Sequence, residues 1–286
     1  MTRKLYVVDQ NFMRRPKFVE FVNAHPSARF VIPDTGLVEM VKTEHWQDTF
    51  RNNFEAFAPI VTKCSMAMSI QEARELEIKT RASAIGRLLP SNFTKLLRGA
   101  IVESQTGIGP TMSLLRDGMA TAREELLQHD LNIDANRGEL ERLVRKFLSE
   151  LSTDGIKACR QDGTAGRVAR LGIARAVGDK FYVAHMRKAD LPDSVSRRLW
   201  KAKCMTRRWC YMQVHHALQW LGEGGIDNAK GQVVLNDILD QDYVLLGSAF
   251  DGILSFEADI HKALEDLQMM LALPSSANAP ILDLSC

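Results

Sequence analysis

Five acidic side chains in this 286-residue sequence follow, or lie within, short apolar runs near its two ends. Asp9 follows Leu5-Tyr-Val-Val8, and an acidic burst follows the run that begins at Ile253. Short buried strands of a parallel sheet bring the residues after them to one edge of that sheet. We therefore expect the five carboxylates to approach one another. They are Asp9, Glu39, Asp242, Glu257 and Asp259.

Carboxylates gathered in this way bind hard divalent cations through oxygen. Mg²⁺ or Mn²⁺ held by Asp and Glu activates water and stabilises charge on phosphoryl and leaving-group oxygens, which phosphodiester hydrolysis requires. Asp9 is the first expected ligand because a buried strand fixes it, and Asp242 is the second. Asn11 and Ser255 are polar neighbours that could orient water or a carboxylate. The alternative interpretation is a set of solvated acids at loop ends.

Apolar runs and helical patterns alternate at the start of the chain. Residues 5–8 and 30–32 predict strands, and residues 59–62 predict a third. One helix is expected to open at Pro16, and another to be capped by Asp34 or Thr35. This order predicts an α/β fold with a parallel sheet flanked by helices. A further short strand is expected at residues 253–255.

The middle of the chain is expected to be mostly helical. Ser69 and Glu72 form a capping-box pattern, and Pro192 stands where a long helix should begin. Helices are predicted at residues 69–89, 111–129, 136–151 and 192–221, the last being the longest, with a short strand at 181–184. The predicted organisation is a discontinuous domain of residues 1–65 plus 230–270, a helical insertion of residues 66–229, and a tail of residues 271–286.

Basic residues are concentrated in one segment. Residues 155–210 hold 14 Lys and Arg against 4 Asp and Glu, a local charge of +10 in a chain whose net charge is +2. Such asymmetry favours a surface for a polyanion. Arginines interleaved with tryptophan and tyrosine suit stacking on bases beside phosphate contacts. The arginines expected to bind nucleic acid are Arg197, Arg198, Arg207 and Arg208. Solvated helix faces and core aromatics are the alternative.

Two cysteines and two histidines near residue 210 invite a zinc interpretation. Cys204, Cys210, His215 and His216 lie within 13 residues. Their Cys-x5-Cys-x4-His-His spacing matches no usual zinc pattern, and a continuous helix would spread them around its circumference. Helix packing is therefore the preferred interpretation.

Four motifs in chain order resemble those of PIN-domain nucleases. Asp9-Gln-Asn-Phe-Met13 resembles their opening strand motif, and Glu39 resembles the acidic residue of their second helix. Asp242-Tyr-Val-Leu-Leu-Gly-Ser-Ala249 is similar to their third acidic position. Ser255-Phe-Glu-Ala-Asp259 resembles the closing Ser/Thr-x-Asp-x-Asp motif, with Glu257 in place of the usual first Asp. The resemblance covers residues 3–65 and 235–262.

The resemblance implies a metal-dependent endonuclease that acts on RNA in preference to DNA, with Mg²⁺ or Mn²⁺ as cofactor. It also implies an antitoxin or regulatory protein as a partner, and self-association. Two alternatives remain open: a catalytically inactive PIN-like module that binds nucleic acid or supports assembly, and a helical regulatory protein. Metal-dependent turnover would separate the nuclease from both.

The composition sets the expected location. The sequence has five scattered cysteines and no apolar run of the ~18 residues that a membrane span needs. An odd number of dispersed cysteines favours a reducing compartment over a disulfide framework. We therefore expect a cytoplasmic protein without a membrane segment.

Overall fold

The structure is a computed structural model of the 286-residue chain. It describes residues 3–41, 44–128, 151–161, 163–222 and 231–272, together with Arg142, Arg145 and Ser149. The chain divides into two compact units. Unit 1 contains residues 1–72, 86–132 and 239–262, and unit 2 contains residues 73–85, 133–238 and 263–286.

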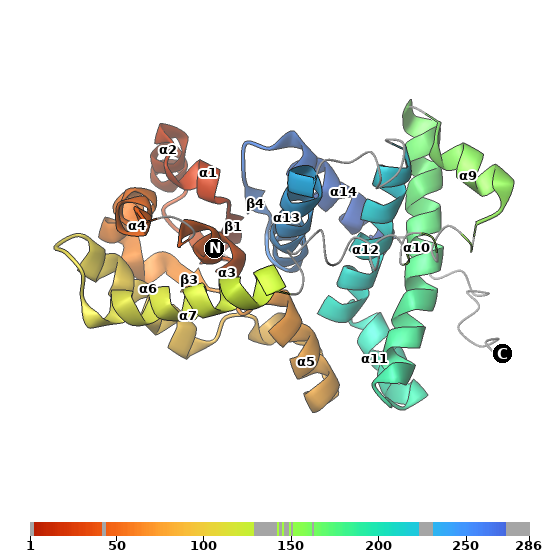
Figure 1. Cartoon of the computed structure of the whole chain (residues 1–286), viewed down its shortest axis with the longest axis horizontal. Coiled ribbons are helices and arrows are strands. Elements are labelled where there is room, and N and C mark those ends of the chain that lie inside the picture. Colours follow the sequence, from red (N-terminus) through yellow and green to blue (C-terminus); the bar gives the residue numbers. More distant parts are fainter. Residues whose placement is uncertain are drawn as a thin grey trace. The chain divides into compact units, whose positions relative to one another are not determined.

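A parallel four-stranded sheet forms the centre of unit 1 (Figure 1). Its strand order is β3-β2-β1-β4, so chain segments from opposite ends of the sequence lie beside each other at β1 and β4. Val7 pairs with Val31 of β2 on one side and with Ile253 of β4 on the other. The strands are β1 (Leu5–Val8), β2 (Arg29–Ile32), β3 (Cys64–Met66) and β4 (Ile253–Leu254).

Three of the four strands lie where the sequence predicts them, and the remaining prediction is wrong. Residues 59–62 belong to the 3-10 helix η1 (Glu55–Lys63), and the third strand is the next segment, Cys64–Met66. An apolar run of four residues carries no period that separates a strand from a helical turn. The actual strand was missed because Ser65, which is buried at the centre of β3, interrupts its run of apolar residues.

The helices of unit 1 bury a core rich in phenylalanine. Phe18, Phe30 and Phe57 are fully buried, and all three rings contact one another. Helix α6 packs on β3 and against α7, while α7 also contacts α3. These helices include α1 (Gln10–Met13), α2 (Pro16–Ala24), α3 (Asp34–Met40), α4 (Trp46–Phe54), α6 (Ser91–Ser104) and α7 (Pro110–Gln128).

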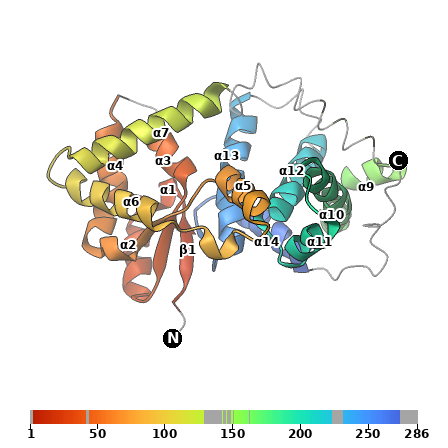
Figure 2. The ribbon, with the colours of Figure 1, turned by 90° about the horizontal axis from the view of Figure 1, so that it is seen from below.

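The described part of unit 2 is helical. Helices α10 and α12 lie side by side with α9 near them (Figures 1 and 2). Tyr182, Met186 and Leu199 contribute to its apolar core. Its helices are α9 (Thr153–Cys159), α10 (Gly163–Lys188), α11 (Asp193–Lys201) and α12 (Met205–Gly222).

Three helices contain residues of both units. Each begins in one unit and ends in the other. The capping box expected at Ser69 is present at the start of α5, because Glu72 N–H donates to Ser69 Oγ at 3.0 Å and Ser69 N–H donates to Glu72 at 3.0 Å. The helices are α5 (Ile70–Thr80), α13 (Gly231–Ala249) and α14 (Ala258–Ala272).

Several predictions for the helical region require correction. Residues 181–184 form part of α10, not a strand, and α10, with 26 residues, is longer than either α11 or α12. That predicted helix is two helices, α11 and α12, separated at 202–204, where Lys203 has a φ of 50°. The helix expected at 69–89 ends at Thr80. The helix predicted for residues 136–151 lies almost wholly outside the described residues.

The coarse class is therefore α/β, with a parallel sheet flanked by many helices. Residues 86–132, which the sequence placed in the helical insertion, group instead with the sheet. Most of the predicted tail, residues 273–286, lies outside the described part of the chain. Within that described part, no helix is both long and apolar enough to cross a membrane.

Candidate functional site

Asp9 directly follows β1, the strand that pairs with β4 from the opposite end of the sequence. Its N–H donates to the Leu254 carbonyl at 3.0 Å, which continues the pairing of β1 with β4. The strand order reverses at this pair, because β2 and β3 lie on one side of β1 and β4 lies on the other. Open α/β sheets bind ligands outside the carboxyl ends of the strands at such a switch point. Asp9 is 5% exposed at this position.

Two hydrogen bonds hold the Asp9 carboxylate. Ser255, the residue after β4, donates from Oγ to Asp9 Oδ2 at 2.8 Å. The Asn11 N–H donates to Asp9 Oδ1 at 3.2 Å, so Asp9 also caps helix α1. The side chain is thus fixed by the ends of two neighbouring strands.

Glu257 is joined to Asp9 through the same neighbours. Its N–H donates to Ser255 Oγ at 3.0 Å, and its Oε1 accepts a hydrogen bond from Asn11 Nδ2 at 3.1 Å. The two polar neighbours predicted from sequence, Asn11 and Ser255, therefore connect the first and last acidic motifs. Asp259 is exposed in the first turn of α14 and lies outside this group of bonds.

A second group of acidic residues lies where α3 meets α13. Thr35 Oγ1 of α3 donates to Asp242 Oδ2 of α13 at 2.6 Å. The helices approach closely at Gly36, where an added Cβ would lie 2.7 Å from the Tyr243 hydroxyl oxygen. Glu39 stands one turn further along α3 and is half-buried.

Tyr243 connects the two groups electrostatically. Burial raises its pKa well above 10, and the negative charges of Glu39 and Asp9 raise the pKa further. The phenol is 1% exposed. The carboxylates of Asp9, which follows β1, and of Glu39 in α3 therefore create a negative potential at one buried hydroxyl group.

Asp34 is a site residue that sequence reasoning missed. The sequence pattern suggests only a helix cap, but Pro33 occupies the cap position and Asp34 lies in the first turn of α3. Burial, together with the nearby charges of Asp242 and Glu72, raises the pKa of Asp34 to about 7. Its Oδ1 is sealed from solvent without a hydrogen-bond partner among the described residues. The available signal in the sequence was an acidic residue two positions after the second strand, beyond Pro33.

The oxygen ligands present at this edge suit a hard cation such as Mg²⁺ or Mn²⁺. Within the described ranges, however, no three acidic, histidine or cysteine side chains lie close enough together to hold a metal ion. The side-chain positions instead form two hydrogen-bonded groups, Asp9 with Glu257 and Asp242 with Thr35. The carboxylate oxygens are thus suitable ligands for a cation, but the described side chains do not converge into a complete coordination site.

Two of the four arginines expected to bind nucleic acid are buried. Arg207 is 2% exposed, and its guanidinium group lies 3.7 Å from the Trp200 ring centroid and donates to the Tyr211 hydroxyl. Arg208 is 7% exposed and donates to the Lys203 carbonyl. Burial lowers the Arg208 pKa to about 10. These two arginines belong to the core of unit 2 and cannot contact phosphate from these positions.

The other two arginines lie on the surface. Arg197 and Arg198 are exposed on α11, and Arg198 donates to the Arg81 carbonyl at 2.7 Å. They remain candidates for contact with a polyanion.

The cysteines and histidines near residue 210 have packing and hydrogen-bonding roles. Cys204 and Cys210 are free thiols in the apolar core of unit 2. His215 Nε2 lies 2.9 Å from Asp266, which also accepts a hydrogen bond from Arg167. The structure supports the helix-packing interpretation of these residues.

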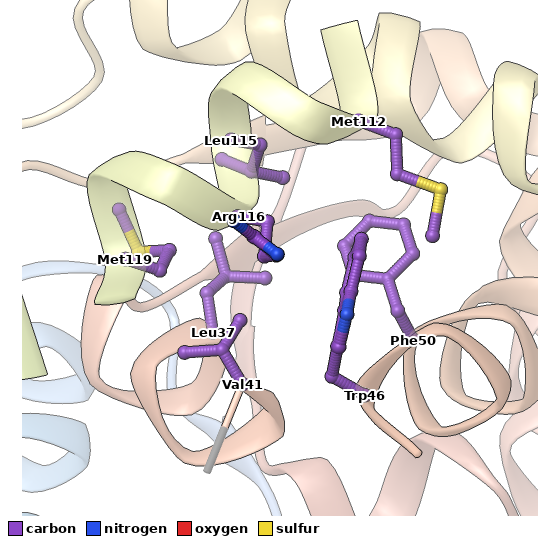
Figure 3. Close-up of a pocket in the computed structure, with 8 residues that line it drawn as sticks. All are labelled: Leu37, Val41, Trp46, Phe50, Met112, Leu115, Arg116 and Met119. Carbon is purple, nitrogen blue, oxygen red and sulfur yellow. The ribbon is translucent and has the colours of Figure 1, made fainter. Parts of the chain in front are cut away.

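A pocket elsewhere in unit 1 differs in character (Figure 3). It is a small pocket, and apolar side chains such as Leu37, Trp46 and Met112 line it. Arg116 is its one charged lining residue in the described part of the chain, with the guanidinium 5.8 Å from the Trp46 ring centroid. Since its described lining includes neither an acid nor a histidine, the acidic edge of the sheet is the stronger candidate for chemistry.

Comparison with known proteins gives no further assignment. No family model, curated protein or solved structure matches the chain.

Proposed function

We propose that this chain is a PIN-type, metal-dependent nuclease that hydrolyses phosphodiester bonds, with RNA as the preferred substrate. Asp9 and Asp242 would hold the cation, assisted by Glu39 and Glu257, and Asp259 would lie further out. When bound, Mg²⁺ or Mn²⁺ would activate water and stabilise charge on the phosphate. An antitoxin or regulatory partner, self-association and a cytoplasmic location belong to the same proposal.

The observation that carries the proposal is the concentration of negative charge around Tyr243 and Asp34. Asp9 and Glu39 both raise the pKa of Tyr243, and Asp242 raises the pKa of Asp34. Carboxylates brought together by folding repel one another, and a divalent cation relieves that repulsion. These carboxylates come from segments far apart in the sequence. Capping of a single helix would not require such an arrangement.

An inactive PIN-like scaffold is the second candidate, and a specific observation favours it. Both Asp9 oxygens already accept hydrogen bonds, from Ser255 and from the Asn11 N–H, as in a structural helix cap. A cation would have to compete with these donors. The two candidates therefore differ in whether divalent cations bind here at all.

Metal binding and turnover test the proposal together. Thermal melts of the wild type with Mn²⁺ should show stabilisation, because a ligand that binds only the folded state raises its stability. Asp9→Asn should remove both the Mn²⁺ effect and Mn²⁺-dependent cleavage of RNA. The matched control is Asp48→Asn, a carboxylate on α4 whose side chain is 61% exposed. A wild-type melt unaffected by Mn²⁺, with no cleavage, would exclude catalysis at this site.

A further inference from the structure

Phe256 places an exposed aromatic ring beside the acidic site. It lies between Ser255 and Glu257, in the turn that joins β4 to α14, and it is 45% exposed. Its ring centroid is 4.8 Å from that of Phe12, with the planes inclined at 37°. Phe12 is buried and contacts Phe18. The Phe256 ring is therefore supported by the core on one side while almost half of the side chain remains accessible.

Positive charges stand next to this ring. Lys17 Nζ lies 5.4 Å from the Phe256 ring centroid. Arg14 donates to Asn11 Oδ1 at 3.3 Å, and the Asn11 amide nitrogen in turn donates to Glu257. Arg14, Arg15 and Lys17 are all exposed. Cations thus border the acidic site where α1 ends and α2 begins.

The combination of an exposed aromatic ring and nearby cations matches one class of ligand. We propose that Phe256, Arg14 and Lys17 form a binding platform for single-stranded nucleic acid. A base would stack on Phe256, while the two cations would contact backbone phosphates. The choice of this ligand rests on the proposed nuclease function. Stacking suits a single strand, because base pairs in a duplex already cover both faces of each base.

The platform also addresses an electrostatic difficulty of the acidic site. A polyanion approaching Asp9 and Glu257 is repelled by their charges, and cations beside them offset that repulsion. A ring fixed next to Glu257 would position one nucleotide at a constant place relative to the carboxylates. An isolated exposed hydrophobic residue would need no explanation. Phe256 is distinguished by its place within the Ser255–Glu257 group and by Lys17 beside its ring.

The test measures binding alone, in the Asp9→Asn background with EDTA present. The probe is a fluorescent oligo(U) of roughly 12 nucleotides, within the usual range of single-strand site sizes. Phe256→Ala and Phe256→Leu should each weaken binding by about 5- to 150-fold, while Phe256→Tyr should bind like the parent because it retains the stacking face. Leu114→Ala, at a residue 64% exposed on α7, is the control and should leave affinity unchanged.

Further measurements test the phosphate contacts and identify the kind of nucleic acid that binds. Arg14→Gln with Lys17→Gln should flatten the salt dependence by about 0.7 in logarithmic slope for each phosphate that is no longer neutralised. Oligo(dT) distinguishes a general single-strand platform from an RNA-specific one, and duplex RNA should bind more weakly than oligo(U). Circular dichroism of each variant verifies folding, and Phe256→Leu tests the loss of the stacking face if Phe256→Ala unfolds.

The outcomes separate this inference from the proposed function. Affinity unchanged in both Phe256→Leu and Phe256→Ala, or preferential binding of duplex, would overturn the platform even if the wild type cleaves RNA. Absence of oligo(U) binding by the parent would overturn it as well. Binding that depends on Phe256 in a protein without Mn²⁺-dependent cleavage would support the platform and reject the nuclease.

Discussion

Asp34 carries a carboxyl group in an environment that opposes its ionisation. Burial and the charge of Asp242 raise its pKa from 3.8 to about 7. Nothing in the local sequence indicates this, because Asp242 lies more than 200 residues away and the shift arises only when α3 and α13 meet. The residue types of the site could be read from the sequence, whereas their ionisation states depend on the fold.

This shift predicts a pH-dependent stability that Asp34→Asn should abolish. Between pH 3.8 and about 7 the folded state holds a proton that the unfolded state has lost. The free energy of unfolding therefore falls as pH rises through that window and becomes level above it. The variant should be more stable than the wild type at pH 8 by on the order of 4 kcal/mol, and similar to it near pH 4. Urea unfolding at several pH values measures the difference.

Asp48→Asn provides the control for this measurement. Its carboxylate is exposed and pairs with Arg51 on α4, so its removal should produce little change at any pH. A difference between wild type and Asp34→Asn that is constant from pH 4 to 8 would contradict the raised pKa.

Ser255 gives the second prediction at this scale. Its Oγ donates to Asp9 and accepts from the Glu257 N–H, and the residue is 8% exposed. Ser255→Ala leaves a buried carboxylate oxygen and an N–H without this partner, which should cost roughly 1–3 kcal/mol. Chemical denaturation measures the loss. Ser255→Thr retains the hydroxyl group and should recover part of it, whereas equal losses in both variants would show that packing decides stability there.

At the scale of whole elements, the sequence was informative where apolar residues are continuous or periodic. The strands at β1, β2 and β4 and the opening of α2 at Pro16 follow from such patterns. The strand predicted at 181–184 failed because aromatic and β-branched residues also occur inside a helix. Leu171, Ala174, Val177, Tyr182 and Met186 are buried along α10 at helical spacings. The helical periodicity over the whole of α10 therefore outweighs the β-strand preference of residues 181–184.

The break before α12 had no sequence signal, and its physical cause is a buried carboxylate. Glu77 is fully buried and accepts hydrogen bonds from the N–H groups of Ala84, Met205 and Thr206, and from the Thr206 hydroxyl. The first N–H groups of a helix lack partners within it, and an acidic side chain satisfies them. A residue from another segment thus fixes the start of α12, and residues 202–204 contain no Gly or Pro that could have indicated it.

Glu77→Gln should therefore destabilise unit 2. The amide would place donors against the N–H groups of Met205 or Thr206, at a cost on the order of 3 kcal/mol. Tryptophan fluorescence during urea unfolding reports chiefly on this unit, because Trp200, Trp209 and Trp220 belong to it and only Trp46 belongs to unit 1. Asp190→Asn, the same chemical change at an exposed residue, is the control. Equal unfolding midpoints for both variants would contradict the assigned role of Glu77.

At the scale of the whole molecule, acidic and basic residues of interest lie in different units. The candidate acidic site lies in unit 1, and the basic segment, residues 155–210, lies in unit 2. The sequence revealed the charge asymmetry but not which cations remain accessible. Arg207 and Arg208 are buried, whereas Arg197 and Arg198 are exposed. A charge count cannot make that distinction, because burial depends on helices that meet only after folding.

The final prediction asks whether unit 2 contributes to nucleic-acid binding. Removing both charges in Arg197→Gln/Arg198→Gln should flatten the logarithmic salt dependence of oligo(U) affinity by up to about 1.4, if each arginine contacts one phosphate. The Asp9→Asn background without divalent cations prevents cleavage during the measurement. Arg51→Gln/Arg116→Gln removes the same number of charges from arginines that already pair with Asp48 and Asp117, and should change the slope less. Equal changes in both pairs would indicate a general effect of net charge. An unchanged slope in the α11 pair would assign Arg197 and Arg198 to the solvated surface or to contact with a protein partner.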